Sequence, residues 1–177
     1  MRYRELGKTG VQISEIVYGA GAVGGLLIRE DPETRLEAVR RALDYGISWF
    51  DTAPAYGNGQ SERNLGSALK ELGANPHVST KVGIRQEHLG DILGEVQRSL
   101  ESSLRRLQRD SVDMITLHSA IGLDRGAAGL LSIEDVLGKR GVVDGFERVR
   151  EQGLVRFFGF SAGGGDEPVS GELAYCS

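Results

Sequence analysis

Four side chains able to take part in acid–base chemistry or hydrogen bonding each follow a short strand-like run. They are Asp51, Lys81, His118 and Ser161, and a fifth polar group, the phenol of Tyr56, comes five residues after the first of them. The carboxyl ends of parallel strands meet on one face of an α/β fold, where binding and catalytic sites are built. We therefore expect these side chains to come together in one site.

An aspartate, a tyrosine, a lysine and a histidine form a coherent set for adding a proton to a carbonyl oxygen. A phenol has a reference pKa of about 10, too high for easy proton transfer at neutral pH, and a nearby ammonium group favours the phenolate. Asp51 would keep the ammonium group of Lys81 charged and in position, and a neutral His118 could orient a carbonyl by hydrogen bonding. Each residue alone also has an ordinary structural explanation, as a helix cap, a solvated lysine, a satisfied histidine or a packing tyrosine.

Strand-like and helix-like patterns alternate along the chain after an opening segment, residues 3–14, that is typical of a β-hairpin. Such alternation implies a parallel sheet with right-handed crossovers. Asp31 and Ser61 are expected to cap the first two helices. The strands are expected at residues 16–18 (a buried strand), 47–50, 77–80, 112–117 and 155–160, and the helices at 31–46, 61–72, 89–107 and 133–152, the last with a break near Gly138 and Gly141.

Two architectures fit this order of elements: an open, doubly wound sheet and a (β/α)8 barrel. The length of 177 residues favours the open sheet, because a barrel usually needs about 250 residues. The motifs described next favour the barrel, which also brings side chains from several strand ends into one crevice.

Several segments of the chain resemble the aldo-keto reductase family. The stretch from Phe50 to Gly66 resembles the family signature, in which Asp and Tyr are separated by four residues and are followed by Gly, Glu and Gly. Residues 79–83 resemble the family's lysine strand, residues 113–118 its histidine strand, and residues 3–10 the hairpin that closes the bottom of its barrel. The resemblance implies the α/β class and a partial (β/α)8 TIM barrel, with an N-terminal β-hairpin and about five of the eight strands present.

The same resemblance divides the chain into a domain and a tail. Residues 1–162 are expected to form a partial aldo-keto reductase barrel domain, truncated after the fifth barrel strand, and residues 163–177 a flexible, glycine-rich tail. A partial barrel leaves unpaired sheet edges and an exposed apolar face, so self-association through those edges is also expected.

The family's chemistry implies a reaction in which hydride from NADPH reduces an aldehyde or a ketone. Tyr56 would be the general acid, Lys81 would ease the loss of its proton, Asp51 would anchor Lys81, and His118 would orient the carbonyl group. NADP is the expected cofactor, NAD remains compatible with the sequence, and no metal site is expected. The resemblance assigns cofactor contacts to Asp51, Thr52, His118 and Ser161.

A glycine motif, Gly19-Ala-Gly-Ala-Val-Gly24, matches the spacing of a dinucleotide-binding loop. In a Rossmann fold, however, a helix opens at these glycines, whereas here a convincing helix begins only at Asp31-Pro32. We therefore expect a flexible loop over the barrel mouth, which in the resembled family borders the substrate pocket.

Two other functions are compatible with the sequence. Lys81 could act as the nucleophilic amine of a Schiff-base barrel lyase, although the Asp–Tyr signature argues against this. Alternatively, the chain could be a non-catalytic barrel fragment or an interaction subunit, because fold alone does not fix function.

Composition limits the classes of partner and the compartment. The formal net charge of −4 argues against nucleic acid or an anionic membrane as a partner. The single cysteine, Cys176, fits a reducing compartment, and no apolar stretch approaches the roughly 20 residues that a membrane helix needs. The sequence thus predicts a cytoplasmic protein that acts on a small-molecule carbonyl substrate.

Overall fold

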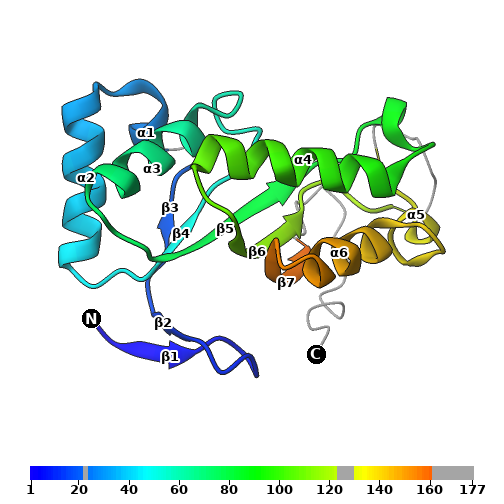
Figure 1. The fold of residues 1–177 in the computed structure, drawn as a ribbon, viewed down its shortest axis with the longest axis horizontal. Coiled ribbons are helices and arrows are strands. Elements are labelled where there is room, and N and C mark those ends of the chain that lie inside the picture. Colours follow the sequence, from blue (N-terminus) through cyan, green and yellow to red (C-terminus); the bar gives the residue numbers. More distant parts are fainter. Residues whose placement is uncertain (22–23, 123–129, 161–177) are drawn as a thin grey trace. The chain divides into compact units, whose positions relative to one another are not determined.

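The computed structural model describes residues 1–21, 24–122 and 130–160 (Figure 1). The chain divides into two compact units, the first made of residues 1–80 and 101–113 and the second of residues 81–100 and 114–177. Each unit is described by itself below. Ser161 and the predicted tail at residues 163–177 lie outside the described residues, and the single domain over residues 1–162 stays a prediction.

The strands form two sheets. The first is an antiparallel hairpin in which Tyr3 pairs with Ser14, as predicted for residues 3–14. The second has five strands that follow one another in the order of the sequence, and the pairs β3–β4 and β4–β5 are parallel. The hairpin strands are β1 (Tyr3–Glu5) and β2 (Gln12–Ser14), and the five-stranded sheet contains β3 (Tyr18–Gly19), β4 (Trp49–Asp51), β5 (His77–Val82), β6 (Val112–Leu117) and β7 (Val155–Phe160).

Helices separate the strands of the five-stranded sheet, as the alternating sequence pattern predicted. In the first unit, α3 packs beside both α1 and α2 (Figure 1). The helices are α1 (Leu26–Arg29), α2 (Pro32–Asp44), α3 (Gln60–Glu71), α4 (Ile92–Leu107), α5 (Ile133–Leu137) and α6 (Val142–Glu151), with a 3-10 turn, η1, at Gln86–His88.

Local signals set the ends of several helices as expected. The carboxylate of Asp31 accepts a hydrogen bond from the backbone N–H of Thr34 at 3.0 Å, and Pro32 occupies the first turn of α2. After α2 the chain turns at Gly46, whose φ of 82° is unfavourable for other residues. The expected break in the last helix is also confirmed, since α5 and α6 are separate helices.

The predicted cap at Ser61 is wrong. Gly59, with φ of 78°, occupies the N-cap position of α3 and makes no side-chain capping bond. The residues before it, Gly57 and Asn58, also have positive φ, so the chain reaches the helix through a left-handed turn. Ser61 therefore falls inside the first turn, where it is fully buried and donates a hydrogen bond to the carbonyl of Ala20 at 2.8 Å.

The buried strand predicted at residues 16–18 is also wrong in part. Only Tyr18 and the following glycine form β3, and the side chains of Ile16 and Val17 are 57% and 43% exposed. The hydroxyl of Ser14 bonds to the carbonyl of Ile16 at 2.6 Å and bends the chain there. Similarly, the helix expected from residue 89 begins at Ile92, because residues 86–88 form the 3-10 turn η1.

Close packing between α3 and the end of α4 depends on a glycine. A Cβ atom added at Gly66 would lie 2.4 Å from the carbonyl oxygen of Leu107, in the backbone of α4. In the same unit the apolar side chains of Phe50, Leu65 and Val78 are fully buried. The first unit thus has its own core, in which α3 approaches the neighbouring helix backbone to backbone.

We predict that Gly66→Ala lowers the free energy of unfolding by about 1–3 kcal/mol, because two backbone segments must move apart. Urea unfolding followed by circular dichroism measures the change. Gly90→Ala is the matched control, since a Cβ there meets nothing within 4 Å, and it should leave stability within about 0.5 kcal/mol of wild type. Equal midpoints for both variants would contradict the packing described.

Candidate active site

Asp51 ends strand β4 in the first unit, and two buried side chains fix its carboxylate. The hydroxyl of Ser79 donates to the Asp51 Oδ1 atom at 2.7 Å, and the indole Nε1–H of Trp49 donates to that hydroxyl at 2.9 Å. Parallel pairing places Ser79 directly across from Asp51. The indole and the hydroxyl are thus aligned donor to acceptor, and they fix the orientation of the carboxylate.

Thr52 follows Asp51 and is fully buried. Its Oγ1 atom lies 2.8 Å from the hydroxyl oxygen of Ser61, whose own proton is donated to the carbonyl of Ala20. Thr52 must therefore be the donor in this pair, and its backbone N–H donates to the carbonyl of Ser79 at 3.0 Å. These bonds fix the chain just before the loop that carries the catalytic tyrosine candidate.

Tyr56 lies half-buried in the loop between β4 and α3. Its N–H donates to the carbonyl of Ala53 at 3.1 Å, its carbonyl accepts from Ser61 at 3.2 Å, and Gly59 closes the loop by donating to Pro54 at 2.7 Å. These bonds give the loop a defined backbone conformation, which positions the phenol.

Gly21, which belongs to the glycine motif of the sequence, lies beside this tyrosine. A Cβ atom at Gly21 would be 3.6 Å from two ring carbons of Tyr56 and 3.9 Å from its hydroxyl oxygen. The helix that follows, α1, has four residues, too few for the helix that opens a dinucleotide-binding motif. In the described part of this segment, Gly21 lies next to the phenol of Tyr56.

Sequence reasoning missed α1, which supports the tyrosine loop. The amide of Asn64 donates to the carbonyl of Leu27 at 2.7 Å, which joins α1 to α3. A Cβ atom at Gly57 would lie 2.6 Å from the Cγ2 atom of Ile28, so α1 also packs closely on the loop. A four-residue helix shows no period in the sequence, and the apolar Leu26-Leu-Ile run was the one available signal.

Lys81 and His118 both lie in the second unit. Lys81 is 7% exposed and sits inside β5, one residue before its end, whereas His118 is exposed and follows β6 directly. The backbone N–H of His118 donates to the carbonyl of Val82 at 2.8 Å. One residue further, the hydroxyl of Ser119 accepts from the N–H of Ile84 at 2.8 Å and donates to its carbonyl at 3.1 Å. Lys81 and His118 are thus brought to neighbouring strand ends.

Thr116 is a polar residue that sequence reasoning did not single out. Its Oγ1 atom is buried and has no hydrogen-bond partner within the described ranges. Because side chains alternate along a strand, Thr116 lies on the same side of β6 as His118, two residues later. A Cβ at Gly159 in β7 would lie 3.9 Å from its methyl group. An unsatisfied hydroxyl beside an expected catalytic histidine is suited to contact a ligand.

Glu62 is the fully buried acidic residue of the signature segment, in the first unit. It accepts a hydrogen bond from the hydroxyl of Thr80 at 2.6 Å and an ion-pair contact from the Nε atom of Arg106 at 2.5 Å. Because both carboxylate oxygens are bonded, the charge can remain buried. Glu62 therefore holds the end of β5, immediately before Lys81 in the chain.

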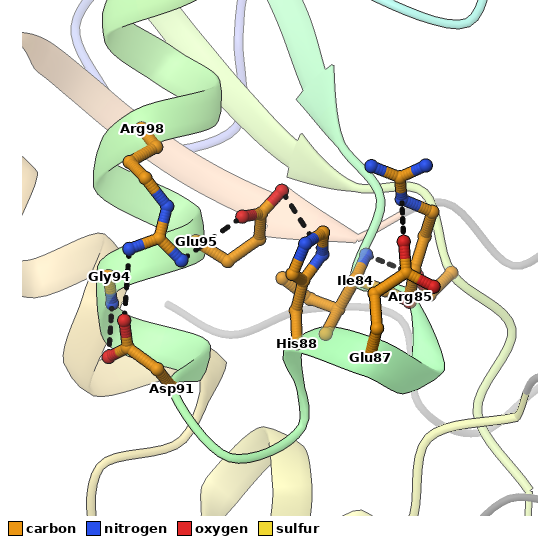
Figure 2. A network of polar contacts seen from close by, with 9 residues as sticks. Ile84, Arg85, Glu87, His88, Asp91, Gly94, Glu95 and Arg98 are labelled. Carbon is orange, nitrogen blue, oxygen red and sulfur yellow. Dashed lines mark hydrogen bonds and ion pairs between the residues drawn. The ribbon is translucent and has the colours of Figure 1, made fainter.

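The segment after β5 carries a polar network in the second unit, shown in Figure 2. Arg98 bonds to Asp91 at 3.0 Å and to Glu95 at 3.3 Å, and Glu95 lies 3.4 Å from the Nδ1 atom of His88. Asp91 also accepts from the N–H of Gly94 at 3.1 Å, within the first turn of α4. The Arg98 guanidinium, and next the Gly94 N–H, lower the pKa of Asp91 below its ordinary value of 3.8.

Within the described ranges, no group of three or more histidine, cysteine, aspartate or glutamate side chains is arranged to hold a metal ion. In the same part of the chain, no helix has the length and apolar character to cross a membrane.

The protein is of the α/β class: helices connect the strands of a parallel sheet, as in part of a (β/α)8 barrel. Polar side chains lie at or near successive strand ends. A profile of the Aldo/keto reductase family matches residues 15–166. The chain therefore belongs to the aldo/keto reductase family.

Individual relatives agree with this assignment. Aldo-keto reductase YhdN of Bacillus subtilis is 40% identical over 129 residues, which cover 67% of this chain and 38% of the relative. An aldo-keto reductase from Bacillus halodurans in its holo form superposes with a TM-score of 0.70 and 27% identity, over 92% of this chain and 50% of the other. An aldo-keto reductase from Klebsiella pneumoniae in complex with NADPH superposes with a TM-score of 0.65 and 27% identity. This match covers 85% of this chain and 46% of the other.

The predicted fold class, a partial (β/α)8 barrel with an N-terminal hairpin, is confirmed by these neighbours and by the five-stranded parallel sheet. The chain spans about half the length of the structures it matches, and less of YhdN.

Two threonines with opposite hydrogen-bonding states give a paired test. Thr80→Val removes the donor to the Oε1 atom of the buried Glu62 carboxylate, and should lower the free energy of unfolding by about 1–3 kcal/mol. Thr116→Val removes a hydroxyl that has no described partner, so stability should stay the same or rise by up to about 1 kcal/mol. Chemical denaturation of both variants checks this, and an equal loss in Thr116→Val would mean that its hydroxyl is satisfied.

Asp91 should make stability depend on pH in the acidic range. Its pKa is lower in the folded state than in the unfolded chain, so its stabilising contribution is present above the ordinary value of 3.8 and is lost as the pH falls through the lower folded pKa. Asp91→Asn should therefore lower the melting temperature at pH 6 but have little effect at pH 2. Melting curves across this range, with Asp110→Asn as the control, measure the difference. Parallel pH profiles for Asp91→Asn and wild type would contradict it.

Proposed function

We propose that this chain forms the catalytic part of a reductase that transfers hydride from a nicotinamide cofactor to an aldehyde or ketone. The observation that carries the proposal is the loop from Thr52 to Ser61, which follows the hydrogen-bonded Asp51 carboxylate and presents Tyr56 beside Gly21. Membership of the aldo/keto reductase family supports the same chemistry.

Tyr56 is proposed as the general acid. Its phenol would give a proton to the carbonyl oxygen as hydride reaches the carbonyl carbon, which converts the carbonyl to an alcohol and leaves a phenolate. The ammonium group of Lys81 would stabilise that phenolate, and Asp51 would hold the ammonium group in place. His118, exposed at the end of β6, would orient the carbonyl through a hydrogen bond.

A nicotinamide cofactor is part of the proposal. None of the four catalytic candidates can supply hydride, so their chemistry requires a bound donor, which NADPH provides. The buried hydroxyl of Thr116, which has no hydrogen-bond partner among the described residues, is a polar group suited to a ligand at this end of β6. The NADPH complex of the Klebsiella relative favours NADP, and NAD is the alternative. The residues proposed to contact the cofactor are Asp51, Thr52, His118 and Ser161.

The proposed partner is a small carbonyl compound, and the proposed location is the cytoplasm, where a chain with one cysteine stays reduced.

Strands β3 and β7 are the two edge strands of the five-stranded sheet, and no described strand pairs with their outer edges. In the second unit Phe160 of β7 is 41% exposed. We propose that a second copy of the chain covers the outer edge of β7.

The decisive variant is Tyr56→Phe. We expect it to lower kcat for reduction of an aldehyde panel by at least about 100-fold, because general acid catalysis is lost, and to leave the dissociation constant for NADPH unchanged. Loss of NADPH absorbance measures turnover, and quenching of protein fluorescence measures binding. Tyr45→Phe, at a tyrosine that is 74% exposed, is the control and should keep wild-type turnover.

Two results would contradict the proposal. Turnover that survives in Tyr56→Phe would remove this residue from the role of general acid. Absence of saturable NADPH binding by the wild-type chain would mean that its residues do not hold the cofactor by themselves.

A further inference from the structure

A shallow, open groove lies between α3 and the end of α4, entirely within the first unit, and none of the residues assigned above to the reaction lines it. Its volume of about 550 Å³ falls in the range of small-molecule sites. The residues that line it are Arg63, Ser67, Ser102, Arg105, Arg106 and Gln108.

The groove is positively charged although the whole chain carries a net charge of −4. Three of its six lining residues are arginines, and none of the six has a carboxylate. The buried Glu62 neutralises only Arg106, by the 2.5 Å contact described above. The ammonium group of Lys70 adds a further positive charge at the rim, where it bonds to Gln108 at 3.1 Å.

Two of the arginines bond only to neutral oxygen atoms in the contacts that the structure shows. Arg63 donates to the carbonyl of Asn58 at 3.0 Å, and Arg105 donates to the hydroxyl of Ser102 at 2.8 Å. Ser67 likewise accepts a bond from the amide of Gln108 at 3.3 Å. Because both serine hydroxyls act as acceptors in these bonds, each can still donate its own proton. Guanidinium and hydroxyl donors together are suited to phosphate oxygens.

Two of the guanidinium groups are also held close to each other. A Cβ atom at Gly59 would lie 2.9 Å from the Nε atom of Arg106 and 3.2 Å from the Nη1 atom of Arg63. Arg63 is in the first turn of α3, where the helix dipole disfavours a positive charge. An anion in the groove would offset the unfavourable position of the Arg63 charge at the start of the helix.

We propose that this groove binds a small ligand that carries two linked phosphoryl groups, such as a pyrophosphate ester. Arg63 and Arg105 come from different helices and line the same groove, so a ligand with two phosphoryl groups can bond to both. Arg63 also bonds to Asn58, in the loop that carries Tyr56, so the bound ligand would restrain that loop. The binding site itself does not depend on the reductase proposal.

Calorimetric titration with inorganic pyrophosphate tests the site. We expect saturable binding with one site per chain, weakened at least about tenfold in both Arg63→Ala and Arg105→Ala, which corresponds to loss of one charged hydrogen bond. Arg148→Ala on α6 removes the same charge from an exposed position outside the groove, and should bind as wild type does. Hydrogen exchange should show new protection at residues 57–63 and 102–108.

Several outcomes separate the proposal from its alternatives. Equal weakening in Arg148→Ala would mean nonspecific attraction, and tighter binding of orthophosphate or of a hexaglutamate peptide would overturn the proposed ligand class. Unchanged binding in Arg63→Ala and Arg105→Ala would overturn the site. If the alanine variants do not fold, Arg63→Lys and Arg105→Lys serve in their place. Because they keep the positive charge, they should bind pyrophosphate with part of the wild-type affinity. Tyr56→Phe should bind pyrophosphate with wild-type affinity. Failure of the reductase proposal can therefore be distinguished from failure of the proposed pyrophosphate site.

Discussion

The first turn of α3 is the feature on which the arrangement of the first unit depends. Ser61 and Glu62 are both fully buried there, and the Glu62 carboxylate bonds to the hydroxyl of Thr80 and to Arg106. This turn therefore joins β5, α3 and the end of α4. The loop that carries Tyr56 is closed by a backbone bond from Ser61, so the position of the phenol follows from the same buried turn. Removing one partner from such a network leaves a buried charge uncompensated, which is strongly destabilising.

Two aspartates in this unit show how position on a strand separates structural from chemical roles. Asp113, near the start of β6, accepts bonds from the N–H of Val78 at 3.0 Å and from His77 at 2.8 Å, and so braces the beginning of β5. Asp51 lies at the carboxyl end of β4 and is oriented by Ser79. In parallel α/β folds, carboxyl ends of strands carry the chemistry and amino ends serve stability, and the role proposed for Asp51 agrees with that division.

Strong local patterns predicted much of the fold. The strands at residues 112–117 and 155–160 were predicted with their observed bounds, because each is an apolar run between turn-forming residues. The cap at Asp31 was predicted correctly because its partner is three residues away. Ser61 was wrong as a cap for the opposite reason: its hydroxyl bonds to Ala20, and nothing in the local sequence distinguishes that bond from a cap. The helix α1 was not predicted, because four residues are too few to show a helical period.

By itself, the sequence determined which chemical groups this protein has and that Asp51, Lys81 and His118 come at or near strand ends, because strand and helix periods and helix starts are local properties. Only the tertiary structure decided that Glu62 is a buried charge, that α1 supports the tyrosine loop, and that three arginines from two helices line one groove. These features depend on contacts between residues far apart in the chain, and packing alone brings such residues together.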